Sequence, residues 1–401
     1  MKDILFVSGS LGLGHILRDL EIVKNLRKLD SNVKVSWLTD YPATTVLENA
    51  REVVLPESML LDHGNKKLED ESKNHGVNLT RWVMNMRKSW SKNVEVVIKL
   101  MKDKKFDLLI GDETYDLAIA FHDNPELKEF PFFMIIDFLG LDSVSKNPLD
   151  LFITYKTNKL WSNFITFEPA LWDKIIFIGD LQDVPDKKFG LRLPNRRKVA
   201  EKYFDFVGYI LNFDPKEYQN KNEIRKNLGY GNEKLVICSI GGTSAGKELL
   251  QLCKKAYPLI KKEIKNLKLV LVTGPNVQVD YVKSEKGITV VGYLPDLFKH
   301  LAAADLCIVT GGGTITLELT ALQKPFLFFP LQNHFEQEVA VADRCDRYNA
   351  GIKMKFSETT PQDLANAVIK NIDKKVSYSS LPIDGAKKAS EIINMFVESN
   401  L

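Results

Sequence analysis

Apolar residues fall into two series of short runs, separated by stretches of helical character. Most runs are continuously apolar, which is typical of strands buried on both faces of a parallel sheet. Only Val33–Leu38 alternates clearly with polar residues, as a strand nearer a sheet edge does. Strand and helix alternate throughout both series, which predicts an α/β protein of two doubly wound, Rossmann-like domains. The predicted strands are Ile4–Ser8, Val33–Leu38, Leu108–Gly111, Phe132–Asp137, Ile175–Gly179, Leu235–Ile240, Leu267–Thr273, Ile288–Val291, Leu306–Thr310 and Phe326–Leu331.

The boundary between the two domains is expected near Phe206–Asn220, where apolar character gives way to Pro, Asn and charged residues. We therefore predict an N-terminal domain over residues 1–207 and a C-terminal domain over residues 208–384. The last stretch, 385–401, is amphipathic and follows a loop around Pro382. We expect it to form a helix that packs back onto the N-terminal domain.

Length and composition agree with this organisation. A chain of 401 residues suits two domains, and its 44% hydrophobic and 27% charged residues are those of a globular protein. With 55 basic and 52 acidic residues, the net charge of +3 gives no reason to expect nucleic acid as a partner. The four cysteines show no metal-binding spacing, and no apolar run approaches the roughly 20 residues that span a bilayer. We expect a cytoplasmic location, no bound metal, and at most peripheral contact with a membrane.

Residues 60–105 break the alternation, because they are highly charged and carry large apolar side chains among basic ones. Two interpretations stay open. The segment forms amphipathic helices that cover a sheet, or it presents a basic, aromatic face to an acceptor or an anionic membrane. The side chains concerned are Arg81, Trp82, Met84, Met86, Arg87, Lys88, Trp90 and Lys92.

A glycine-rich turn, Gly9–His15, follows the first predicted strand and leads into a helix. Glycines let the backbone turn sharply, and the start of a helix offers N–H groups to an anion. The spacing of Gly9, Gly12 and Gly14 is not followed by the acidic residue of a dinucleotide site, so dinucleotide binding is not favoured. His15 lies where ligands bind in such folds, and an imidazole that titrates near neutrality suits a general base. The alternative role of His15 is a structural cap of the helix.

Two further glycine-rich turns lie in the second half, each between a buried strand and a helix. Gly241–Lys247 adds the hydroxyls of Thr243 and Ser244, which suits a diphosphate, but it lacks the register of a Walker loop. Thr310–Thr314 contains three consecutive glycines, which cost conformational freedom unless an anion must reach the backbone. Glu318 follows one helical turn later, where its carboxylate can accept from ribose hydroxyls or simply favour the helix dipole.

A fourth element, Pro330–Gln337, offers amides and a carboxylate to sugar hydroxyls. The third and fourth elements together, GGGTITLELTALQKPFLFFPLQNHFEQ, are similar to the donor-binding signature of the GT-B glycosyltransferases. The most similar subgroup includes the lipid II GlcNAc transferases, with the UDP-glycosyltransferases more distant. Gly241–Lys247 resembles the GGS-x-G-x-[RK] loop of that subgroup. The N-terminal GSLGLGH with Arg18, and the later IGDETYDLA, resemble the acceptor domain of an uncharacterised branch.

This resemblance implies a GT-B fold, in which two Rossmann-like domains face each other across a cleft, and a UDP-sugar donor such as UDP-GlcNAc or another UDP-hexose. It implies that Glu318 binds the ribose. The residues implied at the diphosphate are Thr243, Ser244, Gly312, Gly313 and Thr314. Those implied at the donor sugar are Gln332, Glu336 and Gln337, and those at the nucleobase are Tyr293 and Leu294. On the acceptor side, His15 takes the place of the family's N-terminal histidine, in a loop with Gly12, Gly14 and Arg18.

Two departures from the family pattern bear on the site. Glu336 replaces the usual aspartate and is one methylene longer, which leaves the identity of the sugar open. The N-terminal loop is longer than the compact type, which leaves the placement of His15 open.

The predicted reaction is an inverting, metal-independent displacement at the anomeric carbon, with no cofactor. His15, oriented by Asp112, deprotonates the acceptor hydroxyl, while backbone N–H groups stabilise the leaving diphosphate. An ordinary loop acid is an equally good interpretation of Asp112. Two rival functions stay open, a non-hydrolysing UDP-sugar epimerase and a non-catalytic sugar-nucleotide-binding subunit. The acceptor, a lipid-linked molecule or a cell-surface glycan, and the oligomeric state cannot be read from the pattern.

Overall fold

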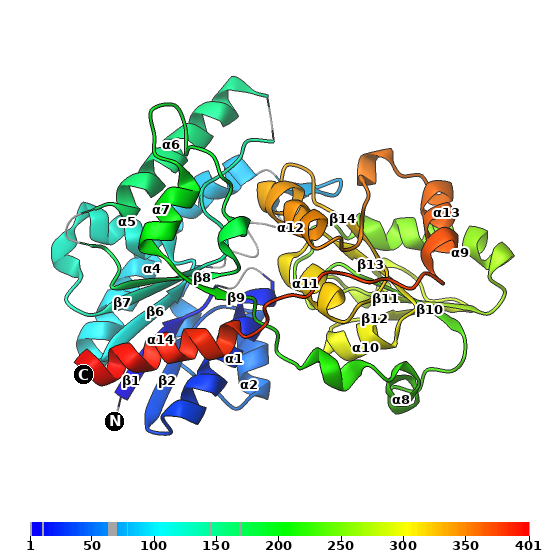
Figure 1. Cartoon of the computed structure of the whole chain (residues 1–401), viewed down its shortest axis with the longest axis horizontal. Coiled ribbons are helices and arrows are strands. Elements are labelled where there is room, and N and C mark those ends of the chain that lie inside the picture. The colour runs from blue at the N-terminus through cyan, green and yellow to red at the C-terminus, as the bar shows by residue number, and fades with distance from the viewer. Residues whose placement is uncertain are drawn as a thin grey trace. The chain divides into compact units, whose positions relative to one another are not determined.

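The computed structural model describes residues 2–9, 12–62, 70–77, 79–144, 146–167 and 170–400. The chain divides into two compact units. Unit 1 is Met1–Lys67, Thr80–Asn212 and Pro382–Leu401, and unit 2 is Leu68–Leu79 and Phe213–Leu381. Each unit has a central sheet with helices packed over it (Figure 1).

The sheet of unit 1 has seven strands in the order β3-β2-β1-β6-β7-β8-β9. Every neighbouring pair is parallel. The chain builds outward from β1 to β3 and then returns to β6 beside β1, so the strand order reverses between β1 and β6. Ligands bind beyond the carboxyl ends of the strands at such a switch point. The strands are β1 Lys2–Val7, β2 Val33–Leu38, β3 Val53–Val54, β6 Leu108–Asp112, β7 Phe132–Ile136, β8 Lys174–Ile178 and β9 Asp205–Gly208.

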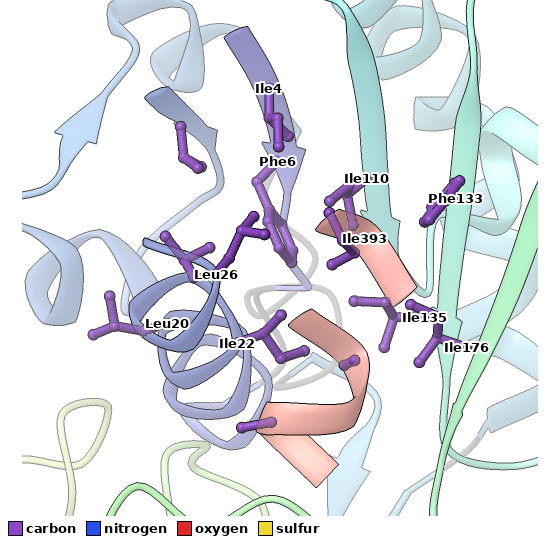
Figure 2. Packing of buried hydrophobic residues seen from close by; sticks show 14 of the residues in the cluster. Ile4, Phe6, Leu20, Ile22, Leu26, Ile110, Phe133, Ile135, Ile176 and Ile393 are labelled. Atoms are coloured by element: carbon purple, nitrogen blue, oxygen red, sulfur yellow. The ribbon is translucent and has the colours of Figure 1, made fainter. Parts of the chain in front are cut away.

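Helices cover this sheet through two apolar clusters. One cluster joins the sheet to α1 and α14, and Figure 2 shows Phe6, Ile22 and Ile393 meeting there from β1, α1 and α14. The other cluster joins the sheet to α4, α5 and the loops around them. The terminal helix α14 therefore packs on α1 within unit 1. The helices are α1 Gly14–Leu29, α2 Ala43–Asn49, α4 Leu79–Lys104, α5 Tyr115–Asp123, α6 Pro148–Ile165, α7 Arg196–Tyr203 and α14 Gly385–Asn400.

The sheet of unit 2 has six strands in the order β12-β11-β10-β13-β14-β15, again parallel throughout, with its switch point between β10 and β13. The two parallel sheets confirm the predicted fold class. The strands are β10 Lys234–Ser239, β11 Leu267–Val272, β12 Ile288–Val291, β13 Leu306–Thr310, β14 Phe326–Phe329 and β15 Ile352–Lys353. The helices are α8 Lys221–Asn227, α9 Glu248–Glu263, α10 Leu297–Ala303, α11 Gly313–Ala321, α12 Ala342–Arg347 and α13 Pro361–Asn371.

One segment departs from the expected division of the chain. Residues 68–79 belong to unit 2, although they precede the rest of that unit by more than a hundred residues and were expected in the N-terminal domain. They contain a small antiparallel hairpin of β4 Ser72–Lys73 and β5 Gly76–Val77. Gly76 pairs in parallel with Gln332, so main-chain hydrogen bonds attach the hairpin to unit 2.

The segment 60–105 is in part an amphipathic covering helix. From Trp90 onward α4 alternates buried and exposed positions, and Val94, Val97 and Met101 pack under the sheet of unit 1. The side chains of 81–89, which carry most of the proposed basic, aromatic face, lie outside the described residues. Within the described part of the chain, no helix is both long and apolar enough to cross a membrane.

Candidate functional site

His15, the second residue of α1, follows the glycine-rich turn after β1. Gly12 adopts a φ of +78°, a left-handed conformation that glycine tolerates without strain. A Cβ at Gly9 would lie 3.2 Å from His15 Cγ, so the absence of a side chain at Gly9 lets the imidazole pack over the turn. Gly14 is the first residue of α1. The turn thereby places His15 at the β1–β6 switch point of unit 1.

His15 forms a dyad with Asp112, the last residue of β6. Nδ1 of His15 lies 2.8 Å from Oδ2 of the buried Asp112. Burial opposes ionisation of Asp112, but Arg18 and His15 outweigh it and hold the pKa of this carboxyl well below its usual range. An ionised carboxylate can only accept, so a proton on Nδ1 is donated to Asp112 in this hydrogen bond. Nη2 of Arg18, which can only donate, lies 2.9 Å from the same nitrogen. With the proton on Nδ1, Nε2 carries the lone pair that a general base needs.

Arg18 holds the dyad from one turn further along α1. It donates to Oδ1 of Asp112 and to Oδ2 of Asp137, each at 2.6 Å. Asp137 directly follows β7, so the guanidinium spans the carboxyl ends of two neighbouring strands. Burial opposes the ionisation of Asp137 as well, but Arg18 lowers the pKa of that carboxyl. Asp137 was not among the predicted site residues, although its position at the end of an apolar run was a usable signal.

A second carboxyl lies behind the dyad. Asp19 is completely buried and accepts a hydrogen bond from the hydroxyl of Ser8. Burial, and after it the negative charge of Asp112, raise the pKa of Asp19 well above its usual value. Of these two carboxyls, Asp19 is thus the one whose ionisation the surroundings oppose, whereas Arg18 and His15 favour that of Asp112.

In unit 2, the turn Gly241–Lys247 links β10 to α9. Gly241 and Gly246 both have positive φ, at +83° and +85°. The loop after β11 supports the turn, because Asn276 donates to the carbonyl of Gly242 at 2.8 Å. Thr243 and Ser244 lie inside this turn, half-buried. Thr243 and Ser244, whose hydroxyls are predicted to bind a diphosphate, thus lie in a hydrogen-bonded loop at the carboxyl end of β10.

The next turn joins β13 to α11 at the switch point of unit 2. A Cβ at Gly311 would fall 2.8 Å from Pro330 Cα, a backbone atom that cannot give way, so only glycine fits. Gly312 is the N-cap of α11 without a side-chain cap, and Gly313 and Thr314 open the helix. N–H groups at an uncapped helix start, with the positive end of the dipole, are suited to an anion.

Arg344 of α12 adds a positive charge at this helix start. It donates to the carbonyl of Gly313 at 2.5 Å and to the hydroxyl of Thr316 at 3.1 Å. Arg344 was not among the predicted site residues, because nothing in the local sequence of 342–347 indicates that α12 packs beside α11. Thr314 and Arg344 therefore belong to one cluster that could hold a diphosphate.

Glu318 lies one turn inside α11 and is only 6% exposed. Burial alone raises the pKa of its carboxyl to about 8. A buried acid with no charged partner among the described residues suits the vicinal hydroxyls of a ribose, because two donated hydrogen bonds would favour its ionised form.

The fourth element surrounds the same helix start. Gln337 accepts from the main-chain N–H of Leu331 at 3.0 Å, so its side chain holds the loop together. Glu336 opens a short π-helix, Glu336–Val341, a form often found at functional sites. A Cβ at Gly313 would lie 3.6 Å from Glu336 Oε1, so this carboxylate lies beside the start of α11.

His334 of the same loop was not among the predicted residues. Its Nδ1 is buried and makes no hydrogen bond within the described part of the chain, and burial lowers the pKa of the imidazole to about 4. It is therefore neutral near pH 7 and available to a hydroxyl.

Tyr293 and Leu294 follow β12 and precede α10. Burial, and after it Asp296, raise the pKa of Tyr293. Their position is again a carboxyl end of a strand, and two strands, β11 and β10, lie between β12 and β13. His15, Arg18 and Asp112 lie in unit 1, and the residues predicted at the donor all lie in unit 2.

Comparison with known proteins gives a family match in the second half of the chain. Residues 236–394 match the family described as the glycosyltransferase family 28 C-terminal domain. The UDP-N-acetylglucosamine--N-acetylmuramyl-(pentapeptide) pyrophosphoryl-undecaprenol N-acetylglucosamine transferase of Clostridioides difficile (strain 630) is 25% identical over 291 residues, which are 70% of this chain and 62% of that protein. An uncharacterised glycosyltransferase of Methanopyrus kandleri is 25% identical over 190 residues, 47% of this chain and 53% of that protein. The chain therefore spans less than two thirds of the length of these relatives.

Solved structures resemble the chain over its whole length. MurG of Acinetobacter baumannii covers 100% of both chains with a TM-score of 0.52 and 16% identity. The UDP-GlcNAc 2-epimerase of Methanocaldococcus jannaschii, solved with UDP-GlcNAc and UDP, covers 99% of this chain and 100% of its own, with a TM-score of 0.59 and 13% identity. These likenesses show a shared fold. Because transferases and an epimerase have it in common, the fold does not select between the two reactions.

Proposed function

We propose that this chain, a GT-B protein whose residues 236–394 form a glycosyltransferase family 28 C-terminal domain, is an inverting glycosyltransferase. Its donor is UDP-GlcNAc or another UDP-hexose, and its acceptor carries a hydroxyl group. Unit 2 binds the donor and unit 1 supplies the base. The observation that carries the proposal is the His15–Asp112 dyad, because transfer to an acceptor hydroxyl requires a base.

In the proposed reaction, Nε2 of His15 takes the proton of the acceptor hydroxyl as its oxygen attacks the anomeric carbon of the donor. A new bond forms from the acceptor oxygen to that carbon, and the bond from the carbon to the diphosphate oxygen breaks. UDP leaves with the electron pair. Asp112 stabilises the imidazolium that forms, and Arg18 keeps Asp112 ionised in its buried position.

The donor half of the proposal rests on the start of α11. Main-chain N–H groups after Gly312 and the guanidinium of Arg344 meet the developing charge of the diphosphate, in place of a metal ion. Glu318 accepts from the ribose hydroxyls. Gln332, Glu336 and Gln337 lie on the loop expected to line the sugar.

For the acceptor, we propose a lipid-linked molecule that the chain meets at the surface of a membrane, in the cytoplasm. Three apolar side chains at the start of α6, Leu149, Leu151 and Phe152, are at least half exposed. Lys156 lies over the ring of Phe152, with Nζ 5.4 Å from its centroid. An exposed apolar stripe with a cation suits the boundary of an anionic bilayer. The Clostridioides difficile relative is named for an undecaprenol-linked acceptor.

The test is a product analysis with radiolabelled UDP-GlcNAc and UDP-glucose, in the presence and absence of a membrane lipid extract. The proposal expects label in the lipid fraction only with the extract, and much less of it with His15→Ala at unchanged UDP affinity. Conversion of the sugar nucleotide to an epimer without any acceptor would instead establish the epimerase. Binding without either product would leave a silent subunit.

A further inference from the structure

The hairpin at residues 72–77 places a histidine inside unit 2. His75 is 1% exposed, and Gly76 and Val77 beside it are also buried. Its ring stacks on Phe356 with the centroids 4.4 Å apart and the planes at 14°. A short polar loop far from the rest of unit 2 in sequence therefore contributes a core side chain to it.

His75 forms a hydrogen bond with the end of β14, the strand that leads into the loop 330–337. Nε2 lies 3.0 Å from the carbonyl oxygen of Phe329, the last residue of β14, so Nε2 carries the proton and donates. The main chain is fixed as well, since the N–H of Gln332 donates to the carbonyl of His75 at 2.9 Å, and the N–H of Val77 donates to the carbonyl of Gln332 at 3.0 Å. Gln332 is thus held on both sides by the hairpin.

The same ring touches the turn at the other side of the donor cluster. A Cβ at Gly246 would lie 3.3 Å from Cε1 of His75, 3.0 Å from Leu331 and 2.9 Å from Thr310. Gly246 lies near the end of the turn after β10, Thr310 is the last residue of β13, and Leu331 lies at the start of the loop 330–337. His75 therefore lies where three donor loops meet, and it contacts two of them.

We propose that His75 is a positioning residue of the donor site, which fixes the loop 330–337 against the turn 241–247. This inference rests on the proposed function, because its expected consequence is weaker donor binding when the two loops are no longer held together. The histidine does not touch the donor itself. Its effect passes through the carbonyl of Phe329, the main chain of Gln332 and the packing of Gly246.

The variant His75→Phe keeps a stacked ring but leaves the buried carbonyl of Phe329 without its donor. His75→Gln returns an N–H at about the position of Nε2. Tyr378→Phe is the matched control, because the hydroxyl of Tyr378 donates to the carbonyl of Lys324 at 3.0 Å, just before the other end of β14. Both substitutions remove one side-chain hydrogen bond to the main chain beside the same strand, at opposite ends.

The measurements are UDP affinity by titration calorimetry and hydrogen–deuterium exchange of the unliganded full chain. We expect His75→Phe to bind UDP about tenfold more weakly and to exchange faster in 241–247 and 330–337. His75→Gln should recover most of the affinity, and Tyr378→Phe should lower the melting temperature without either effect. If His75→Phe does not fold, Phe356→Leu, which removes only the stacking partner, must show the same pattern to a lesser degree.

Equal UDP affinity and equal exchange in His75→Phe and Tyr378→Phe would overturn the inference. Failure of the unsubstituted chain to bind UDP would count against the proposed function instead. The exchange comparison then decides the inference alone, because it needs no ligand.

Discussion

Arg18 donates to Asp112 and to Asp137 at the same distance of 2.6 Å, and the first of these bonds joins the guanidinium to the carboxylate that also holds His15. The ion pair explains why a fully buried carboxyl stays ionised. An ionised Asp112 favours the tautomer of His15 that has its proton on Nδ1 and its lone pair on Nε2. The side chains that favour His15 as the base therefore come from α1, β6 and the residue after β7.

Asp112→Asn should lower the turnover number about 10²- to 10⁴-fold while leaving UDP affinity unchanged. An asparagine can offer its NH2 group to Nδ1, which would move the histidine proton to Nε2 and block the base. The checks are steady-state kinetics and titration with UDP. Asp142→Asn is the matched control in unit 1, because Asp142 pairs with Arg196 at 3.1 Å and has no part in the dyad. Equal losses in the two variants would contradict this role for Asp112.

Binding of UDP should release close to one proton near pH 7. In the unliganded chain burial raises the pKa of Glu318 to about 8, so the carboxyl is protonated at pH 7. Two ribose hydroxyls would favour the ionised form and lower that pKa, and the proton leaves as the ligand binds. Above about pH 9 the carboxyl is already ionised, so the release should vanish. Calorimetry in buffers of different ionisation enthalpy measures the release, and Glu318→Gln should abolish it. A release that persists in Glu318→Gln would assign the proton to another group.

Arg344→Ala should weaken UDP binding about tenfold, because it removes the cation at the start of α11. Arg347→Ala is the control on the same helix, since the guanidinium of Arg347 lies over the ring of Tyr348, 5.3 Å from its centroid. The loss for Arg344→Ala should shrink as salt is raised, whereas Arg347→Ala should bind UDP normally at every salt concentration. Identical titrations of the two variants would remove Arg344 from the site.

Ile393→Ala should lower the free energy of unfolding by about 2–5 kcal/mol, because Ile393 is fully buried in the cluster that joins α14 to α1. Met395→Ala on the same helix should change it by less than about 0.5 kcal/mol, since Met395 is 66% exposed. Urea denaturation of both variants gives the comparison. A small effect of Ile393→Ala would mean that α14 is not part of the folding unit of the first sheet.

Most interior strands were predictable because each is a continuous apolar run. Val33–Leu38, which alternates with polar residues, was predicted with the bounds that β2 has. The edge strands β3, β9 and β15 were missed, and the first and last of these have only two residues, which give no pattern. The hairpin at 72–77 was missed for another reason. Its place in unit 2 depends on pairing with Gln332 and on the burial of His75, and neither can be predicted from the local sequence.

The site was predictable where a residue ends a strand or opens a helix. His15, Asp112 and Glu318 were found in this way, and the roles given to them stay predictions. Arg344 and Asp19 could not be found, because a charge becomes part of the site only when another element packs beside it. The dyad itself joins positions 97 residues apart, a separation at which sequence spacing carries no information.

The most direct test of the account is calorimetric titration of the unsubstituted chain, Glu318→Ala and His15→Ala with UDP and a panel of UDP-, GDP-, TDP- and ADP-sugars. The account predicts selective binding of UDP and one UDP-sugar, loss of that binding in Glu318→Ala, and normal binding in His15→Ala, which then fails to transfer the sugar. Absence of binding to every nucleotide, or undiminished binding in Glu318→Ala, would contradict it.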